Sequence, residues 1–509
     1  MNKYILLFIE SQWYSLNLDN HDEYQKSIRF TTDSLYVTFQ TSDLIRYFKE
    51  KHVRKLPIII DLECLDKQMS QEGKEFRGHS SWKAIQALRY HKIIDEDFEL
   101  TKSTFKVFLE HLASLYSKLY EKDNLEQNRF VNLEMQVNSL IYERQFKGIK
   151  INLHAAREKS IEVERKIYDI KNRLQIEHNI FVPNAEKQQI AFLEQKGYNI
   201  INSPRNTFKI RRYDDPVCNL FYELIRNEQD LESLIYIQSH WGGESRTYPT
   251  YYGFGTITSR IMLRQPALQN LKKDNRSVII PERGMKLLYI DYSQFEAGIL
   301  ASLSGDENLI SLYNTDIYID LAEKVLGSEL KRKEAKIIFY RYMYGDTTLG
   351  TKALEYFNKF VKLKEFMEQT HLNASVNRKV GTTNGNFRYT NGEDYNWSLS
   401  HVIQSTASLI LKNALVRVHT NVTKAEFLIP MHDAALYQIK DNDYEKCKTE
   451  IIDIYIEEFK KLCPKIKASI DTEPFYPTRH IAAFETIPAL NIEDFEKITN
   501  ITLNLDFET

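Results

Sequence analysis

Two aspartates each stand at the end of a run of apolar residues. Asp291 ends the run that begins at Leu287, and Asp433 lies between the apolar runs Phe427–Met431 and Ala434–Ile439. A carboxylate at the end of a core strand is costly to bury unless something pairs with it. Two strand-borne aspartates could hold two metal ions about 4 Å apart, an arrangement that serves phosphoryl transfer. The alternatives are a helix cap at Asp291 and a simple turn position at Asp433.

A basic and aromatic stripe lies between the two aspartates. Arg332, Lys336, Tyr340 and Tyr344 recur at steps of four residues. On a helix they form one slowly winding stripe about 18 Å long. Two cations followed by two rings suit a nucleoside triphosphate, with the charges on the phosphates and the rings against sugar and base. The alternative is a solvated basic face whose tyrosines pack into a core.

The elements that must position these residues follow from hydrophobic periodicity. The first 100 residues contain strand-like runs at Tyr4–Ile9, Leu35–Gln40 and Pro57–Leu62. From about residue 102 to 180 the pattern becomes helical, and Val163–Leu174 carries apolar residues at steps of three and four. Runs around Asp291 and Asp433 predict a strand followed by a helix, and a hairpin. The fold class is therefore mixed α/β.

Composition bounds the remaining possibilities. The chain has 509 residues, of which 42% are hydrophobic and 27% charged, with 17 glycines and 12 prolines. This predicts an ordinary globular protein of roughly three or four domains. No apolar run reaches the roughly 18 residues that span a bilayer, so we expect no membrane association and a cytoplasmic location. The four cysteines form no CxxC pair, and a net charge of −2 means that nucleic-acid binding would need local basic patches.

Taken in order, these pieces resemble the DNA polymerase I family (family A). Asp291–Glu296, continued by Ile299–Asp306, is similar to its motif A, and His432-Asp433 to its motif C. Arg332, Lys336, Tyr340, Tyr344 and Gly345 match motif B. The flanking similarities are Arg246–Tyr251, Thr258–Arg260, Pro266–Leu271 and Gln404–Ala407. The resemblance covers about residues 130–475.

The resemblance implies a role for each matching residue. Asp291 and Asp433 would be catalytic and would bind two Mg²⁺ ions, helped by the backbone carbonyl of Tyr292. Glu296 would crowd the 2′ position of the sugar and so select deoxynucleotides. The implied nucleotide-binding residues are Arg332, Lys336, Tyr340, Tyr344, Gln294, Glu296 and Tyr318. The implied primer–template residues are Arg260, Gln269, Asn270, Gln404 and His432.

Several positions depart from the family pattern. Ala434 follows Asp433 where the family often has Glu, which predicts that no third carboxylate assists there. Tyr340 replaces a common Phe, which in the family implies poor discrimination against dideoxynucleotides, and Tyr318 replaces a common His. Asn396 and Ser400 replace Arg and Asn near the template–primer. No departure removes a metal ligand or Lys336, so we expect activity.

The family likeness implies a right-hand polymerase with palm, fingers and thumb behind a small N-terminal α/β domain. The predicted segments are 1–125 (N-terminal domain), 126–240 (lead into the palm, and thumb), 241–310 (palm with motif A), 311–420 (fingers), 421–480 (palm with motif C) and 481–509 (acidic tail). Asp61-Leu-Glu63 has the form that begins a proofreading exonuclease site, and His91 with Asp95 resembles its end. These are too close together for that site, so we predict a truncated, inactive exonuclease-like domain or an unrelated α/β domain, in either case without proofreading.

The predicted activity is DNA-templated DNA polymerisation, in replication or repair, by a monomer acting on primer–template DNA and deoxynucleoside triphosphates. Residues 502–507 resemble a sliding-clamp-binding peptide, and the alternative is a tail packed on the protein. Glu296 speaks against a single-subunit RNA polymerase. A template-independent or RNA-copying polymerase stays open as an interpretation, and so does a nucleic-acid-binding relic without activity.

Overall fold

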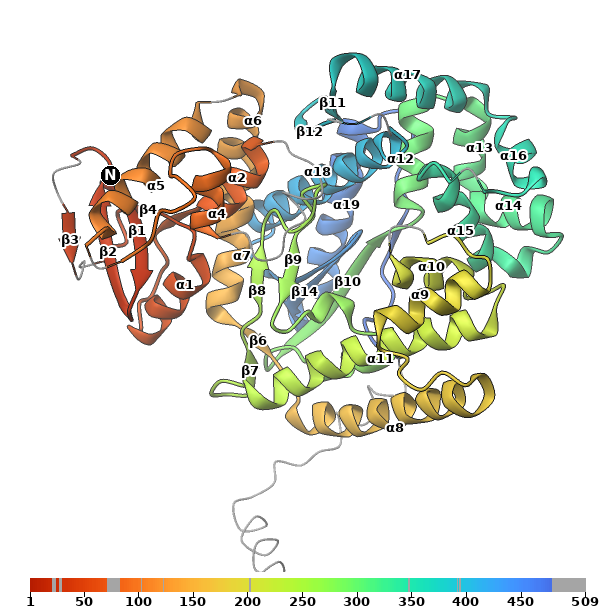
Figure 1. Cartoon of the computed structure of the whole chain (residues 1–509), viewed down its shortest axis with the longest axis horizontal. Coiled ribbons are helices and arrows are strands. Elements are labelled where there is room, and N and C mark those ends of the chain that lie inside the picture. Colours follow the sequence, from red (N-terminus) through yellow and green to blue (C-terminus); the bar gives the residue numbers. More distant parts are fainter. Residues whose placement is uncertain are drawn as a thin grey trace, which may run out of the picture.

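The structure is a computed structural model of the whole chain (Figure 1). It describes residues 1–20, 24–26, 30–70, 83–101, 103–121, 123–200, 203–346, 348–390, 392 and 395–477. Within these ranges, no helix is both long enough and apolar enough to cross a lipid bilayer. The acidic tail 481–509 and the clamp-like peptide 502–507 lie outside the described residues.

The N-terminal part is a five-stranded mixed sheet with helices packed on it (red to orange in Figure 1). Its strands are β1 (Lys3–Ile9), β2 (Gln12–Asn17), β3 (Tyr24–Lys26), β4 (Leu35–Thr38) and β5 (Ile58–Asp61), in the order β3-β2-β1-β4-β5. Its helices are α1 (Thr41–Glu50), α2 (Leu62–Ser70), α4 (Ala84–Tyr90) and α5 (Phe105–Tyr120). Strands β1, β4 and β5 confirm the three predicted strands. They run parallel to one another, whereas β2 and β3 are antiparallel to their neighbours.

A helical segment leads from this part to two long packed helices. The segment contains α6 (Asn124–Arg129), a π-helical turn η1 (Phe130–Glu134), α7 (Met135–Lys147) and the short strand β6 (Ile149–Lys150). The helices that follow are α8 (Leu153–His178), α9 (Glu186–Gln195), α10 (Pro204–Arg211) and α11 (Pro216–Ser239). Val163 and Leu174 of α8 are fully buried where α8 runs along α11, which confirms the predicted amphipathic helix.

A four-stranded sheet forms the centre of the larger part of the molecule, in the order β13-β14-β10-β15. The strands are β10 (Met285–Tyr292), β13 (Ala425–Met431), β14 (Ala434–Lys440) and β15 (Ile470–Asp471). The predicted strand at 287–291 and the predicted hairpin at 427–439 are confirmed. Because β13 is an outer strand, Pro430 can lie within it without breaking a ladder on both sides.

Short elements connect the long helices to this sheet. They are β7 (Arg246–Thr247), β8 (Thr250–Tyr252), β9 (Met262–Arg264), η2 (Leu268–Asn270) and η3 (Lys273–Val278). Beyond β10 the chain forms α12 (Phe295–Ser304), α13 (Glu307–Thr315), α14 (Ile317–Leu326), η4 (Glu329–Lys331), α15 (Arg332–Met343), α16 (Thr351–Phe357), α17 (Val361–Asn377), β11 (Lys379–Thr382), β12 (Gly385–Tyr389) and α18 (Ser398–Asn421). The last elements are η5 (Asp441–Asp443) and α19 (Tyr444–Leu462).

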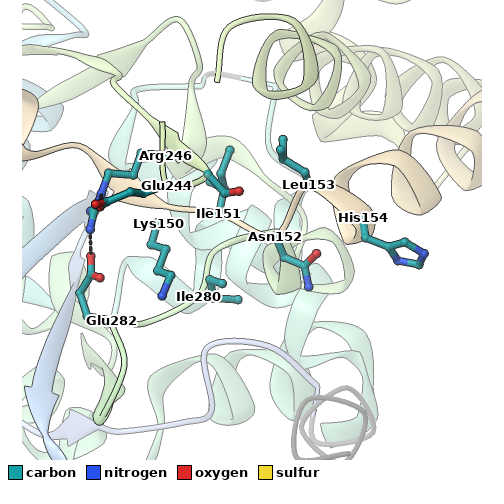
Figure 2. Close-up of a pocket in the computed structure, with 10 residues that line it drawn as sticks. Lys150, Ile151, Asn152, Leu153, His154, Glu244, Arg246, Ile280 and Glu282 are labelled. Atoms are coloured by element: carbon teal, nitrogen blue, oxygen red, sulfur yellow. Dashed lines mark hydrogen bonds and ion pairs between the residues drawn. The ribbon is translucent and has the colours of Figure 1, made fainter. Parts of the chain in front are cut away.

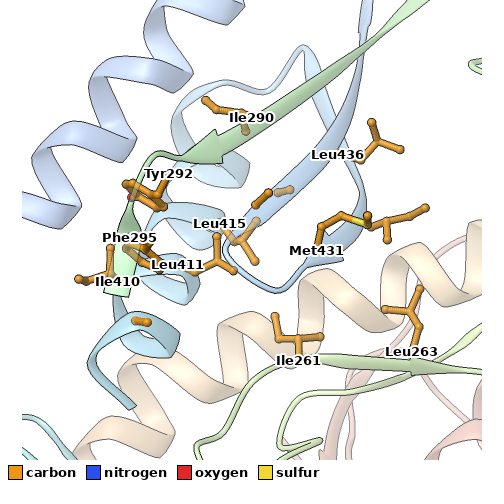
Figure 3. Close-up of a cluster of buried hydrophobic side chains, with 14 of the residues drawn as sticks. Ile261, Leu263, Ile290, Tyr292, Phe295, Ile410, Leu411, Leu415, Met431 and Leu436 are labelled. Atoms are coloured by element: carbon orange, nitrogen blue, oxygen red, sulfur yellow. The ribbon is translucent and has the colours of Figure 1, made fainter. Parts of the chain in front are cut away.

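The sheet and the helices around it share one apolar core. Figure 3 shows side chains from β10, α18 and the β13–β14 hairpin gathered there, with Ile261 and Leu263 close by. Ile290, Ile410, Leu415 and Leu436 are all fully buried. Full burial of a side chain of this size is worth about 1.5–3 kcal/mol relative to exposure. The core therefore fixes β10 and the hairpin, which carry the two aspartates.

A buried charge network ties the two parts of the molecule together. Lys412 of α18, 1% exposed, donates to Glu134 of η1 at 2.6 Å, and Glu134 also pairs with Arg129. Arg129 in turn donates to Glu126 at 2.7 Å. Removing one member of a buried ion pair leaves the other charge buried without a partner. The free-energy cost of that unpaired charge is larger than the stabilisation that the intact pair provides.

Lys412→Met should therefore lower the free energy of unfolding by about 3 kcal/mol. Urea denaturation followed by circular dichroism measures this change. Lys424→Met, which removes an exposed lysine paired with Asp443, is the control and should leave the midpoint unchanged. An unchanged midpoint for Lys412→Met would contradict a stabilising role for the network.

Candidate active site

Strand pairing brings the two predicted catalytic aspartates together. Asp291 of β10 lies opposite Ala434 of β14, and Asp433 is the residue just before it, in the β13–β14 turn. The Tyr292 N–H also faces the Asp433 carbonyl at 3.4 Å. Helix α12 has Gln294 at its N-cap, so Asp291 is not the cap of that helix. Asp433 does occupy a turn, and that turn places it beside Asp291.

The environment of Asp291 is unfavourable for a bare carboxylate. Burial, followed by the charge of Asp433, raises the pKa of Asp291 to about 6, although the Tyr289 hydroxyl donates to its Oδ2 at 3.2 Å. A divalent cation would relieve both effects, since it supplies positive charge where two carboxylates converge. Two carboxylates and a backbone carbonyl at Tyr292 are the hard oxygen donors that Mg²⁺ prefers. The donor set therefore fits the predicted ions.

A further carboxylate enters the site from a strand that the sequence did not reveal. Asp471 of β15 lies directly opposite Asp291 and accepts a hydrogen bond from Ser293. It adds to the negative charge that raises the Asp291 pKa. Among the described residues, no three His, Cys, Asp or Glu side chains are arranged to ligate one metal ion. Asp471 thus contributes charge near the pair without completing a three-acid ligand set.

The raised pKa of Asp291 predicts how metal binding depends on pH. The ionised form binds a cation, and this form is lost as the pH falls through about 6, because protons then compete for the carboxylate. The concentration of Mg²⁺ that half-saturates the protein should rise roughly tenfold between pH 7.5 and pH 5. Mn²⁺ titration followed by electron paramagnetic resonance measures binding directly. Asp291→Asn should abolish the pH dependence, and a flat profile in the unmodified chain would contradict the prediction.

Glu296 and Arg260 form an ion pair beside the aspartates. Glu296 is on the first turn of α12 and is only 3% exposed. Arg260 Nη2 lies 2.5 Å from Glu296 Oε1 and 3.4 Å from Asp433 Oδ1. Burial raises the pKa of the Glu296 carboxyl, and the guanidinium opposes that rise. One arginine therefore links the predicted sugar-selecting residue to a predicted metal ligand.

The predicted stripe lies along α15, and its last member, Tyr344, caps the end of that helix. Lys336 Nζ is 5.6 Å from the centre of the Tyr318 ring and 5.8 Å from that of Tyr340. Among the described residues, no carboxylate lies within ion-pair distance of Lys336, which keeps its charge available for an anion. Tyr344 accepts a hydrogen bond from the Gln404 amide at 2.8 Å.

Arg332 is held by a residue that the sequence reasoning missed. Asp316 Oδ2 accepts from Arg332 Nε at 2.8 Å and from Nη2 at 2.7 Å. Its Oδ1 caps α14 by accepting from the N–H groups of Tyr318 and Ile319. Asp316 therefore aligns the start of α14, which carries Tyr318, with the start of α15. An Asp before an apolar run signals an N-cap, but nothing local indicates the second partner.

The remaining predicted nucleotide residues take internal positions. Tyr318 is 1% exposed and packs edge-on against Phe339. The Gln294 amide donates to the Tyr313 carbonyl at 3.1 Å and accepts from the Ile317 N–H at 3.0 Å. Gln294 thus joins α12 to α13 and α14, and its side chain is engaged by the protein itself.

The predicted primer–template residues fall into two groups. His432 precedes Asp433 in the turn, with a φ of 41°, and lies near Arg260. Gln269 and Asn270 lie in η2 beside α11. The Gln269 amide is buried and donates to the Leu263 carbonyl at 3.0 Å, and the Asn270 carbonyl accepts from Arg226 of α11 at 2.8 Å. Arg260, Gln404 and His432 adjoin the aspartates and α15, whereas η2 lies against α11, β9 and β13.

The acids considered for an exonuclease site are engaged within the N-terminal part. Asp61 accepts from the Cys64 N–H at 2.9 Å and from the Tyr142 hydroxyl at 3.2 Å. Glu63 pairs with Lys67 at 2.5 Å. His91 pairs with the fully buried Asp66 at 2.6 Å, while Asp95 is exposed. Each contact is structural, and the absence of proofreading stays a prediction.

A cavity of about 670 Å³ lies away from this chemistry, where α8 begins (Figure 2). Its wall includes Lys150, Asn152 and the ion pair between Arg246 and Glu282, whose charged atoms are 2.6 Å apart. The His154 ring points away from the other labelled residues in Figure 2. None of the predicted site residues lines this cavity.

Comparison with known proteins shows what this chain is similar to. Residues 231–473 match the model of DNA polymerase family A. DNA polymerase I of Caldicellulosiruptor bescii is 26% identical over 420 residues, covering 70% of this chain and 49% of the relative. DNA polymerase I of Borreliella burgdorferi is 25% identical over 422 residues, covering 72% and 46%. The chain thus spans about half the length of these relatives, or less.

A solved structure shares the fold. The POL domain of Pol1 from M. smegmatis, in complex with DNA primer-template and dNTP, superposes with a TM-score of 0.70. The match covers 92% of this chain and 94% of that one, at 16% identity. The matched segment 231–473 contains both aspartates, Arg260 and the whole α15 stripe. This segment, slightly less than half of the chain, is therefore the part that is similar to DNA polymerase family A.

Proposed function

We propose that this protein is a DNA-templated DNA polymerase that adds deoxynucleotides to a primer 3′ end by two-metal nucleotidyl transfer. The observation that carries the proposal is the convergence of Asp291 and Asp433 next to Lys336, a cation close enough to favour the ionised form of Asp291. In this assignment 241–310 and 421–480 form the palm, and 311–420 form the fingers. Residues 126–240 lead into the palm and form the thumb, and 1–125 form the N-terminal domain.

Each predicted site residue has its own role in the proposed reaction. Bound Mg²⁺ would lower the pKa of the attacking 3′ hydroxyl and neutralise charge on the leaving pyrophosphate. Lys336 and Arg332 hold the triphosphate, and Asp291 and Asp433 supply the carboxylates that bind the ions. Tyr340 lies against the sugar and Tyr344 near the templating pair. Catalysis is then positioning plus electrostatic stabilisation.

The duplex would lie along the thumb. Arg205, Lys209 and Arg212 are carried on or just after α10, and Lys209 is close enough to Glu296 and His432 for their charges to interact. Phosphate contacts of this kind are independent of sequence and weaken as salt rises. This gives the chain a basic strip beside the site although its net charge is −2.

Primer extension in Mg²⁺ tests the proposal. The chain should extend a primer on a DNA template with the complementary deoxynucleotide only. Extension without a template would indicate a template-independent enzyme, and equal extension on RNA would indicate an RNA-copying one. Inactivity on every template would indicate a nucleic-acid-binding relic and refute the proposal.

Glu296→Ala should admit ribonucleotides. Removing the side chain frees the space beside the sugar 2′ position, and discrimination between deoxy- and ribonucleotides should fall by roughly tenfold to a hundredfold. The ratio of kcat/KM for dATP and ATP measures it. Glu296→Gln keeps the shape and serves as the control, with a ratio close to that of the unmodified chain. An unaltered ratio in Glu296→Ala would remove Glu296 from sugar selection.

Other parts of the proposal concern partners and location. We propose a monomer without proofreading that works in the cytoplasm, where the four buried free cysteines would stay reduced. A sliding clamp remains a candidate partner through residues 502–507. Clamp-dependent synthesis that is unaffected by deleting residues 500–509 would exclude that partner.

A further inference from the structure

Strand β12 has a buried polar residue near its start, just after the exposed turn of the β11–β12 hairpin. Asn386 follows Gly385 and is fully buried, with a φ of 58°. Burying an amide is unfavourable unless its hydrogen bonds are made. The partners of Asn386 therefore indicate what the start of β12 does.

Those partners belong to the loop that carries Arg260. Asn386 Nδ2 donates to the Thr258 carbonyl at 3.0 Å and to Ser259 Oγ at 2.9 Å. Ser408 of α18 donates to the Ser259 carbonyl at 2.9 Å. Ser259 has a φ of 59°, a left-handed conformation that a non-glycine residue keeps only when its surroundings hold it. The hydrogen bonds from Asn386 and Ser408 help to keep Ser259 in this conformation.

The next residue in the chain faces the active site. Arg260 follows Ser259, and its guanidinium contacts Glu296 and Asp433. The backbone conformation at an arginine sets the point and the direction from which its side chain departs. The conformation of Ser259 thus sets where the guanidinium can reach.

The start of β12 is itself fixed from the other side. The Phe387 N–H donates to Glu126 of α6 at 3.0 Å, and the Asn386 carbonyl lies 3.0 Å from His401 Nε2 of α18. Glu126 is fully buried and is held by Arg129 and by Gln68 of α2. The start of β12 therefore lies between α6 and the Arg260 loop, with hydrogen bonds to both.

We propose that Asn386 is a positioning residue for sugar selection. It holds the Thr258–Arg260 loop so that Arg260 orients Glu296, the residue that crowds the nucleotide 2′ position. The proposal rests on the proposed polymerase function and adds a residue that never touches the nucleotide.

The test measures discrimination between dATP and ATP in template-directed extension. Asn386→Ala removes both donated hydrogen bonds and should reduce the discrimination ratio about tenfold, because the loop that directs Arg260 loses its contacts with β12. Asn386→Asp is the second variant, because Asp keeps the shape and tolerates positive φ but cannot donate to the Thr258 carbonyl. Asn384→Ala, at an exposed position of the same hairpin, is the control and should match the unmodified chain.

A double-mutant cycle distinguishes a positioning role of Asn386 from a nonspecific loss of structure or activity. If Asn386 acts through Arg260 and Glu296, then Asn386→Ala should cause no further loss of discrimination in a Glu296→Ala background. Additive losses, or an unchanged ratio in a folded and active Asn386→Asp variant, would overturn the inference. Thermal unfolding of each variant establishes that it is folded. Failure of the unmodified chain to extend any primer would instead refute the proposed function.

Discussion

Asp433→Ala should abolish primer extension, with a loss of roughly 10³-fold or more in kcat. In the proposed mechanism the two carboxylates would hold the ions that stabilise the developing charge, a contribution of several kcal/mol, and each 1.36 kcal/mol corresponds to tenfold in rate. Single-turnover extension on a preformed primer–template complex measures this loss without interference from product release.

The control for Asp433 lies at the other end of the same strand. Asp441→Ala removes an exposed carboxylate just after β14 and should leave the rate unchanged. Asp433→Asn keeps the shape of the turn and of the contact with Arg260, so it should be folded and equally inactive. A variant at Asp433 that keeps a tenth of the activity would contradict the two-metal mechanism.

Lys336→Ala should reduce kcat/KM for the incoming nucleotide roughly a hundredfold. The ammonium belongs to the stripe, and no carboxylate of the described residues lies within ion-pair distance of it, so its charge is available to a triphosphate. A hydrogen bond to a charged group is worth about 1.5–3 kcal/mol, and 3 kcal/mol corresponds to about two orders of magnitude. Steady-state kinetics with varied dNTP measures it.

Two further variants test whether the effect of Lys336→Ala comes from the loss of the charge at this position. Lys336→Arg keeps the charge and should recover part of the activity, although its planar guanidinium replaces a compact ammonium. Lys333→Ala, an exposed lysine of the same helix outside the stripe, should behave like the unmodified chain. A nucleotide KM unaffected by Lys336→Ala would mean that the stripe does not bind the triphosphate.

The sequence was most informative where one local pattern determines the structure. The strand that ends at Asp291, the hairpin around Asp433 and the helix that begins at Arg332 all have the predicted positions, because hydrophobic periodicity and turn residues are local signals.

Partners that arrive from distant segments could not be predicted in this way. Asp471 lies in a two-residue strand whose pairing with β10 leaves almost no periodic signal. Asp316 has a residue type that often caps helices, but its contact with Arg332 depends on how α14 packs against α15. Gln294 and Asp61 have the residue types of site members, yet tertiary contacts engage them within the protein. These are long-range contacts, which a single sequence does not encode locally.

The edge strands of the four-stranded sheet influence whether separate molecules can associate by strand pairing. At one edge, β13 contains Pro430, which offers no N–H to a strand from outside, and η2 packs against the same strand. At the other edge, β15 is only two residues long. A strand from a second molecule that approached β13 would therefore meet a missing donor at Pro430 and the covering residues of η2. The β13 edge of the sheet that carries the two aspartates is thereby poorly suited to edge-to-edge aggregation.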